Sequence, residues 1–560
     1  MKKRILALIG LAVSASLLLS ACGGTVASKS ASASAKTTSA SSDAKSASGS
    51  GQASTNKAVV TTKTGERTTA NGKASGKDTV VFVINSEPTS LEPGATSSSD
   101  SYSRICMIQC YETLLREAPA DRTKLQPLIA ESWEFAKDGK SVTFKIADGI
   151  KFSNGDALTA DDVEYSLNKE IKMPAVSDIA SMMENAQKVD ANHVKLNLKY
   201  SYKPVLNVLC NPVFSIIDKA YYEKCQSDGT NFGRNPIGTG AYILKNWQNG
   251  QSITYEANPN WHGGKAAIKN LEVRFMADAT TAAIALESGD CDVFYGVDSA
   301  DLPRLRENKD VNVLSVQSSG FYFIALNTEK TPLDNVKVRK AVALAINRQE
   351  IIDGGQDGVG WVTECPITPG IFGYQKDFKA EAQNIDKAKS LLKEAGYEKG
   401  FTLDMKTPES SYYSRPAQVI QEELRQIGIT VNLSTMERGA FNQDVSNRNY
   451  ESIYFWIGAS YPDADNIVYK LFNSEYADAK SVTNMANLKN DDADKLIKDA
   501  RSSLDDNERI KLYGQLSKLN DDNAWYIPIL TSTNTLCARA ELGGAYGNSA
   551  AFYFASDWNY

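Results

Sequence analysis

Histidine is rare in this sequence, and the usual motifs of metal-dependent and nucleotide-dependent enzymes are absent. Only two of the 560 residues are histidine, His193 and His262, and neither belongs to a His-x-x-x-His or Cys-x-x-Cys pattern. Those spacings are typical of zinc sites. The sequence also lacks Gly-x-x-x-x-Gly-Lys-Ser/Thr, the phosphate-binding loop of many ATPases. We therefore expect a protein that is not an enzyme and that uses no metal and no cofactor.

Long apolar runs are almost absent as well. The only one covers residues 5–19 and follows three basic residues at positions 2–4, which is typical of a secretory signal peptide. It is shorter than the roughly 20 residues that cross a bilayer. The run ends in LSAC, which resembles the lipobox of bacterial lipoproteins, where the cysteine is lipidated and becomes the first residue after cleavage. We expect a signal peptide at 1–21 and a lipid on Cys22 as the only membrane anchor; a plain signal peptide that contains a cysteine is the alternative.

Aromatic residues, leucine, isoleucine and methionine are missing from residues 23–77, which are rich in serine, alanine, threonine and lysine. Such a segment cannot bury enough apolar surface to offset its ordering entropy. We expect residues 22–77 to form a disordered tether with an end-to-end distance of about 40 Å. It would hold a folded body at the extracytoplasmic face of the cell membrane, on the surface of a Gram-positive cell.

The folded body is acidic. Residues 1–77 carry eleven lysines and arginines and two acidic residues, a net charge of +9, whereas the whole chain has a net charge of −6. Residues 78–560 therefore carry a net charge of about −15, which disfavours nucleic-acid binding. About 480 residues are too many for one hydrophobic core, so we expect two or three structural units.

Seven cysteines follow Cys22, an odd number in an exported chain. At least one of them is therefore expected to be a free thiol. Cys106 and Cys110 lie four residues apart in an expected helix and are predicted to be core or groove residues. Cys210 and Cys225 could close a short loop through a disulfide, although spacing alone does not determine the pairing.

The body shows a mixed α/β pattern. Asp138-Gly139 separates two runs of which the second alternates apolar and polar residues, and this predicts a β-hairpin. Thr159, with Asp162 three residues later, is typical of a capping box at the start of a helix. A strand at 401–405, a helix opened by Pro416 and closed by Gly428, and a β-rich run after it predict a βαβ unit. The stretch DKAKSLLKEAGY predicts an amphipathic helix that starts at Asp386 and ends at Gly396.

Several motifs, in order along the chain, resemble one protein family. LQPLIAESWEFAKDGKSVTFKIADGIKFSNGDALTADDVEYSLN at 125–168 resembles the signature of the family 5 extracellular solute-binding proteins, the oligopeptide, dipeptide and nickel receptors of ABC importers. The resemblance continues through NPIGTGAYILKNW, YEANPNWHGG, ALESGDCDVFYG, LNTEKTPLDNVKVRKAVALAINRQEII, IDKAKSLLKEAGYEKGFTL and QEELRQIGITVNLSTME. It covers nearly all residues from Thr79 to the C-terminus.

The resemblance implies an α/β, two-lobed fold of the periplasmic-binding-protein type, of class II and of the large cluster with an extra subdomain, with the lobes joined by a hinge. Lobe I would comprise 78–316, with the subdomain at about 116–234, and lobe II would comprise 317–525. The last residues, 526–560, would return to lobe I. Such a receptor would enclose a peptide or another small solute by hinge closure and deliver it to the permease and ATPase subunits of an importer. We expect a monomer.

The resemblance also indicates which residues face the solute. Tyr295 follows the GDCDVF run, and Trp456 and Phe323 lie in the expected strands FWIG and FYFIALN; core packing is the alternative for both of these. Arg415 lies near the position of a carboxylate-binding arginine in dipeptide receptors, or is merely solvated. The residues expected to bind peptide backbone are Thr96, Ser97, Ser98 and Ser99.

One position departs from the family pattern. Peptide receptors carry an aspartate just before the YPDPDN-like motif to hold the ligand's amino group, and here that position is Ser460. We expect Asp463, three residues later, to take over this role; the alternative is that it caps the turn formed by Pro462. The change disfavours a strictly amine-anchored dipeptide and leaves a non-peptide solute such as an oligosaccharide open. A surface sensor or adhesin with the same fold is a further alternative.

Overall fold

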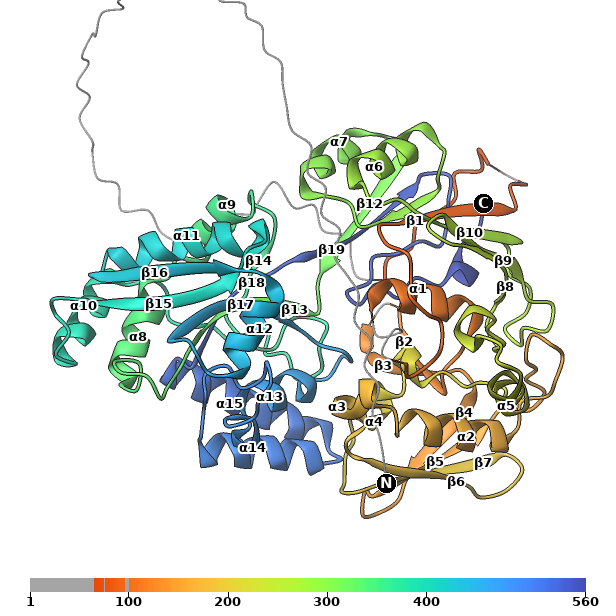
Figure 1. Ribbon diagram of the computed structural model, residues 1–560, viewed down its shortest axis with the longest axis horizontal. Helices are drawn as coiled ribbons and strands as arrows, with labels where there is room; N and C mark the ends of the chain where they lie inside the picture. Colours follow the sequence, from red (N-terminus) through yellow and green to blue (C-terminus); the bar gives the residue numbers. More distant parts are fainter. Residues whose placement is uncertain (1–64, 75, 96–99, 120) are drawn as a thin grey trace, which may run out of the picture. The chain divides into compact units, whose positions relative to one another are not determined.

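The computed structural model describes residues 65–560 except 75, 96–99 and 120. Within these residues the strands form a seven-stranded, a six-stranded, a four-stranded and a two-stranded sheet (Figure 1). Cys22 and Thr96–Ser99 lie outside the described residues. No described helix combines the length and the apolar character that a membrane crossing requires.

The seven-stranded sheet has the order β12-β19-β11-β1-β10-β9-β8. Its central strand β1 pairs in parallel with β10 and β11, and the other neighbours are antiparallel. Phe82 packs in one core with Ile105 of α1, while the next residue, Val83, packs in another core with Ala282 of α6. Because side chains alternate along a strand, β1 is buried on both faces. The elements are β1 Thr79–Ile84, α1 Ser101–Cys110, β8 Tyr242–Gln248, β9 Ser252–Ala257, β10 Asn270–Phe275, α6 Ala279–Ser288, β11 Val293–Tyr295, α7 Leu302–Glu307, β12 Val311–Gln317 and β19 Thr533–Arg539.

Buried residues between Leu114 and Ile216 form a separate core around the four-stranded sheet β4-β5-β7-β6. The predicted hairpin is confirmed: β4 and β5 pair antiparallel, and Val142 and Phe144 are fully buried. The capping box is confirmed as well, since the Asp162 carboxylate accepts hydrogen bonds from Thr159 N at 2.9 Å and Thr159 Oγ1 at 2.7 Å. The elements are β2 Leu115–Ala118, β3 Asp121–Pro127, β4 Ala130–Phe135, β5 Ser141–Ile146, α2 Ala160–Glu170, α3 Ser177–Ala180, β6 Met183–Lys188, β7 His193–Leu198, α4 Val205–Val208 and α5 Lys219–Asp228.

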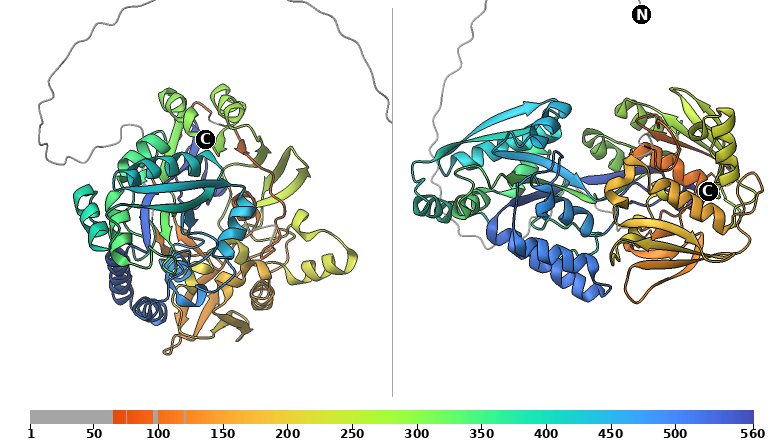
Figure 2. Two further views of the ribbon diagram at one scale, coloured as in Figure 1. Left: turned by 60° about the vertical axis from the view of Figure 1, so that its left-hand side comes forward. Right: turned by 60° about the horizontal axis from the view of Figure 1, so that its bottom comes forward.

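The six-stranded sheet has the order β14-β18-β13-β17-β15-β16 and is covered by helices (Figure 2). Successive residues of β13 alternate between two cores, with Phe323 in one and Ile324 in the other. α14 and α15 lie side by side at the edge of one of these cores (Figures 1 and 2). The elements are β13 Gly320–Leu326, α8 Val336–Ala345, α9 Arg348–Gly355, β14 Trp361–Val362, α10 Ile385–Glu394, β15 Phe401–Pro408, α11 Ser411–Arg425, β16 Ile429–Met436, α12 Arg438–Ser446, β17 Ser452–Gly458, α13 Asp465–Phe472, α14 Asp491–Ser502, α15 Asp506–Asn523 and β18 Tyr526–Thr531.

The predicted βαβ unit is confirmed, but its helix starts earlier than predicted. β15 and β16 pair in parallel on either side of α11 in the sequence, and α11 begins at Ser411 with Pro416 in its interior. Proline lacks the N–H that would bond the carbonyl four residues before it. That carbonyl, of Tyr412, accepts a hydrogen bond from Gln356 Nε2 at 2.9 Å instead. The side chain of a residue distant in the sequence therefore provides the hydrogen bond that Pro416 cannot donate. Helix α10 also differs slightly from its prediction, since its N-cap is Asn384.

The chain passes twice between the seven-stranded and the six-stranded sheet. The first passage joins β12 to β13 through Ser318 and Ser319, and the second joins β18 to β19 through Ser532. Figure 1 shows β19 leading from β18 into the seven-stranded sheet. Because β18 pairs with β13, the six-stranded sheet extends six residues beyond the predicted boundary at 525.

Two further expectations are corrected by the structure. The predicted disordered segment ends too late, because Thr68 N donates to Ala545 O at 2.8 Å and Arg67 forms an ion pair with Asp557 at 2.9 Å. The cysteine pairing is also wrong. The seven described cysteines are buried free thiols, and Cys210 and Cys225 belong to different cores.

Candidate functional site

Two adjoining cavities lie where the chain passes between the two large sheets. The Tyr322 cavity has a volume of about 290 Å³ and the Trp456 cavity of about 410 Å³. They share Tyr295 and the segment Ser532–Asn534 as lining residues, so they lie next to each other. The Tyr322 cavity is otherwise lined by Gly296, Val297, Ser299, Leu302, Tyr322, Gln356, Val359, Tyr412 and Thr535. The Trp456 cavity is otherwise lined by Ser101, Arg104, Ser318, Ser319, Trp456, Gly458, Ala459, Ser460, Ser549, Ala550, Ala551 and Phe552.

The backbone around the site is closely packed. Ser318 N donates to Ser532 O at 2.8 Å, which joins the two passages between the sheets. Asn534 Nδ2 donates to Asn548 O at 2.7 Å and holds the C-terminal loop against β19. At the end of β11, Gly296 has φ +113°, and a Cβ there would lie 1.5 Å from the Asn85 side chain. Glycine is therefore required at 296 to place Tyr295 at the cavity wall.

The lining consists mainly of uncharged polar groups and several aromatic rings. Among the described residues that line the two cavities, Arg104 is the only charged one. Burial raises the pKa of Tyr295 to about 12, so its hydroxyl keeps its proton at neutral pH. Such walls offer hydrogen bonds and stacking surfaces, which is typical of a small-molecule site.

Three of the predicted site residues line these cavities. Tyr295 lines both, and Trp456 and Ser460 line the Trp456 cavity. Ser460 is held in place because its N–H donates to Asn466 Oδ1 at 2.8 Å, and its carbonyl accepts from Asn211 Nδ2 at 3.1 Å. The structure thus brings these three residues together, and their contact with solute stays a prediction.

Two other predicted residues lie outside the cavity lining. Phe323 is fully buried in the core beneath β13 and packs against the ring of Tyr526 at 5.5 Å, as the core-packing alternative expects. Arg415 is exposed and donates to both carboxylate oxygens of Asp357, at 2.9 and 2.5 Å. Neither residue is among those that line the Tyr322 or the Trp456 cavity.

Asp463 lies in a different environment from the one predicted. Its side chain is 1% exposed, and both carboxylate oxygens accept hydrogen bonds from Arg509 Nη2 at 2.8 Å. Oδ1 also accepts from the N–H of Asp465 at 3.0 Å, a turn-capping bond of the kind the alternative proposed. The carboxylate thus has a buried counter-ion and does not line either cavity.

Sequence reasoning missed much of the cavity wall. Ser532–Asn534 covers the second passage between the sheets and the start of β19. Gln356 directly follows α9, and Tyr412 lies in the first turn of α11. One local signal was available, since TSTNT is a short polar run between two apolar strands. The others are brought together only by the fold.

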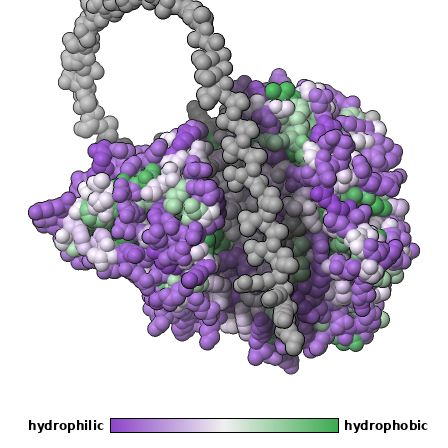
Figure 3. Space-filling view, viewed as in Figure 1, coloured by the Kyte–Doolittle hydropathy of each residue, from purple (hydrophilic) through white to green (hydrophobic). Residues whose placement is uncertain are grey.

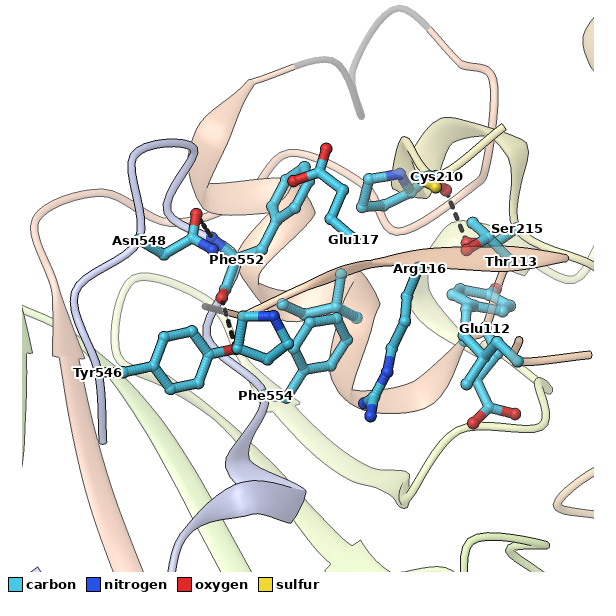
Figure 4. A pocket seen from close by; sticks show the side chains of 15 residues that line it. Glu112, Thr113, Arg116, Glu117, Cys210, Ser215, Tyr546, Asn548, Phe552 and Phe554 are labelled. Atoms are coloured by element: carbon cyan, nitrogen blue, oxygen red, sulfur yellow. Dashed lines mark hydrogen bonds between the residues drawn. The ribbon is translucent and has the colours of Figure 1, made fainter. Parts of the chain in front are cut away.

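Two further cavities are less suited to a solute. A small one, shown in Figure 4, has a volume of about 20 Å³, enough for about one water molecule. One of its residues, Glu112, accepts hydrogen bonds from His262 Nε2 at 2.9 Å and Trp261 Nε1 at 3.0 Å. A larger one, of about 470 Å³, includes Tyr469 and Arg501 in its wall. The Arg501 guanidinium already stacks on the Tyr469 ring at 3.5 Å.

The region of the four-stranded sheet contacts the region of the six-stranded sheet directly. The Tyr202 hydroxyl shares a hydrogen bond of 2.8 Å with the Tyr461 hydroxyl and donates to the Asp465 carboxylate. Arg501 lies over the Tyr202 ring at 5.2 Å, and Lys203 Nζ donates to Leu504 O at 2.8 Å. We call this group the Tyr202 contact. Both regions must separate there if the cavities open widely.

Hydrophilic residues cover most of the face shown in Figure 3, and apolar residues on it occur in scattered patches. Among the described residues, no group of three or more histidine, cysteine, aspartate or glutamate side chains could hold a metal ion. The Tyr322 and Trp456 cavities are therefore the best candidates for a functional site.

Comparison with known proteins agrees with this description. Heme-binding protein A of Haemophilus influenzae is 28% identical over 488 residues, which is 82% of this chain and 88% of that protein. The dipeptide-binding protein of Escherichia coli is 28% identical over 494 residues, 83% of this chain and 91% of that protein. The solved structure of HbpA2 from Haemophilus parasuis matches with a TM-score of 0.79 and 27% identity, covering 86% of this chain and 99% of that one. The predicted fold class is confirmed.

The sequence profile of the bacterial extracellular solute-binding proteins, family 5 Middle, matches residues 124–478, more than half of the chain. Proteins of this family bind solutes and are not enzymes. The chain belongs to family 5 of the bacterial extracellular solute-binding proteins.

Proposed function

We propose that this chain is the solute receptor of an ABC importer, that it holds its solute in the joined Tyr322 and Trp456 cavities, and that it delivers it to a permease with its ATPase subunits. The observation that carries the proposal is the position of the cavities. Both are lined by residues from the seven-stranded sheet, the six-stranded sheet and the passages between them. A solute there touches both halves at once.

Binding would then favour a closed conformation. Residues 78–318 with 533–560 form one lobe of this proposal, and residues 319–532 form the other. A solute that contacts both lobes only when they are close shifts the population toward closure. The Tyr202 contact would form part of the closed conformation, because it joins the two lobes on one side of the cavities.

Peptides are the proposed solutes. The pairing of β17 with β15 ends at Ile453, so the later residues of β17 have no strand partner on that side among the described strands. Trp456 and Gly458 lie in this stretch and also line the cavity. An extended peptide could add to such an edge through its backbone, with side chains in flanking pockets. The names of similar proteins include a dipeptide-binding and a heme-binding protein, so a non-peptide solute is the second candidate.

The receptor would be held outside the cell membrane by a lipid on Cys22. This residue lies outside the described residues, and the proposal rests on the lipobox and the signal peptide in the sequence. Metabolic labelling with an acyl precursor should label the wild-type protein and not Cys22→Ala. Equal labelling of both would contradict it.

Solute binding can be tested with the solute that the protein itself retains. The protein is incubated with a peptide digest, washed, and denatured, and the released solutes are identified by mass spectrometry. The identified solute, returned at about a hundred times its dissociation constant, should raise the free energy of unfolding by roughly 2.7 kcal/mol. Small-angle scattering should show a smaller radius of gyration at the same time. Stabilisation without compaction would argue against closure, and no retained solute would argue against a receptor.

A further inference from the structure

We infer that the solute presents a carboxylate to Arg104, and that the receptor selects an anionic group and has no carboxylate to hold an ammonium group. The inference rests on the proposed function and names the class of its solute. Its starting point is the charge of the cavity wall, in which Arg104 is the one charged side chain among the described lining residues.

Arg104 is held at the wall without a counter-ion in contact. It lies in α1, and its Nε is shut off from solvent and has no hydrogen-bond partner among the described residues. No ion pair links it to a described carboxylate. Burial lowers its pKa. Arg104 as a whole is half-buried, and a cation that is partly removed from water is costly unless something pairs with it.

Arg104 and the nearby Arg122 differ in their charged neighbours. Arg122 also lies close by, but its Nη2 donates to Glu117 Oε1 at 3.0 Å and its Nη1 donates to Ser549 Oγ at 2.9 Å. Asp100 raises the pKa of Arg104 from a distance. Asp100 is exposed, and its carboxylate caps α1 by accepting a hydrogen bond from Ser103 N at 2.8 Å. Arg122 is therefore neutralised locally, whereas Arg104 remains available to the cavity.

The rest of the wall suits the neutral part of such a solute. Ser319, Ser460 and Asn534 offer hydroxyl and amide groups, and Trp456 offers an apolar ring. Because no acidic side chain is among the described residues that line either cavity, an ammonium group would be buried there without a charged partner. A guanidinium binds a carboxylate through a charge-assisted hydrogen bond, which is stronger than a neutral one. The cavity thus favours acids over amines.

The test compares matched probes that differ only in charge. The probes are tetra-alanine, its C-terminal amide and its N-acetyl derivative, together with gluconate and glucose as a non-peptide pair. In whichever class binds, peptide or sugar, calorimetry should show that the acid binds at least tenfold more tightly than its neutral partner. N-acetylation should weaken binding by less than threefold. The variant Arg104→Gln should lose the preference for the acid, and Arg104→Lys should keep part of it.

Arg425→Gln is the matched control, because Arg425 is exposed at the end of α11 and pairs with Glu422. It should keep the full preference. Thermal unfolding without solute checks that each variant folds. If Arg104→Gln does not fold, the ratio of the affinities of the wild-type protein for the acid and for the amide still tests whether the cavity prefers a carboxylate.

The outcomes separate this inference from the proposed function. An amide or sugar that binds as tightly as its acid would overturn the role of Arg104 and leave the receptor intact. If none of the probes binds, the solute retained from the peptide digest decides: a carboxylic acid lost by Arg104→Gln supports the inference, and a neutral or purely cationic solute overturns it. No retained solute and no bound probe would overturn both.

Discussion

Replacing Asp463 by asparagine separates the structural role of this residue from the solute-binding role that its sequence position predicts. Asp463 and Arg509 have side chains that are 1% and 2% exposed, and Arg509 Nη2 lies 2.8 Å from both carboxylate oxygens. Removing one charge leaves the other buried and uncompensated, which typically costs 3–5 kcal/mol. Asparagine keeps the shape and one acceptor oxygen. We therefore expect Asp463→Asn to lower the free energy of unfolding by about 3 kcal/mol.

Urea unfolding of the solute-free protein measures this loss, and calorimetry measures affinity under conditions where the variant is folded. The double variant Asp463→Asn with Arg509→Met removes both charges, and it should be more stable than Asp463→Asn alone because no unpaired charge remains. Solute affinity should change by less than threefold in the folded variant. Wild-type stability combined with a tenfold or greater loss of affinity would refute this reasoning and restore the ammonium-binding role.

Three further predictions follow from particular contacts. Burial raises the pKa of Glu423 to about 8, so between about pH 4.5 and 8 the unfolded state releases a proton that the folded state keeps. The free energy of unfolding should therefore fall with rising pH, by about 3 kcal/mol up to pH 7. Urea titrations at several pH values should show this slope for the wild type and not for Glu423→Gln. Thr159→Ala removes the cap of α2 and should cost about 1 kcal/mol in the same assay, with a change below 0.3 kcal/mol counting against it. Tyr202→Phe removes the hydroxyl of the Tyr202 contact. If closure forms this contact, solute affinity should fall about tenfold or more, and scattering should show a larger radius of gyration for the solute-free protein. Unchanged affinity would show that the contact does not contribute to closure.

Local structure was largely predictable from the sequence because its signals are local. The hairpin around Asp138-Gly139 and the capping box at Thr159 depend on residues within a few positions of each other, and both are confirmed. The start of α11 was not predictable in this way. Its proline is tolerated because Gln356, about sixty residues earlier, bonds the freed carbonyl. A proline signal alone does not reveal such a partner.

The candidate site was predictable only in part. Tyr295 ends β11 and Trp456 lies near the end of β17, and both residues, which the motif positions indicated, line the Trp456 cavity. Asp463 was expected there because it is three residues from Ser460, but sequence proximity does not fix the direction of a side chain. Its partner Arg509 lies 46 residues further along. Arg104 was missed because its proposed role depends on the absence of an ion-pair partner among the described residues, which its sequence neighbours do not reveal.

The most direct test of the account is a crystal structure of the protein with the solute that it retains from a peptide digest. We predict that the solute lies in the joined cavities, touches Tyr295, Trp456 and Asn534, and directs a carboxylate to Arg104. A solute bound instead in the cavity beside Tyr469 and Arg501, or only on the outer surface, would contradict the central claim.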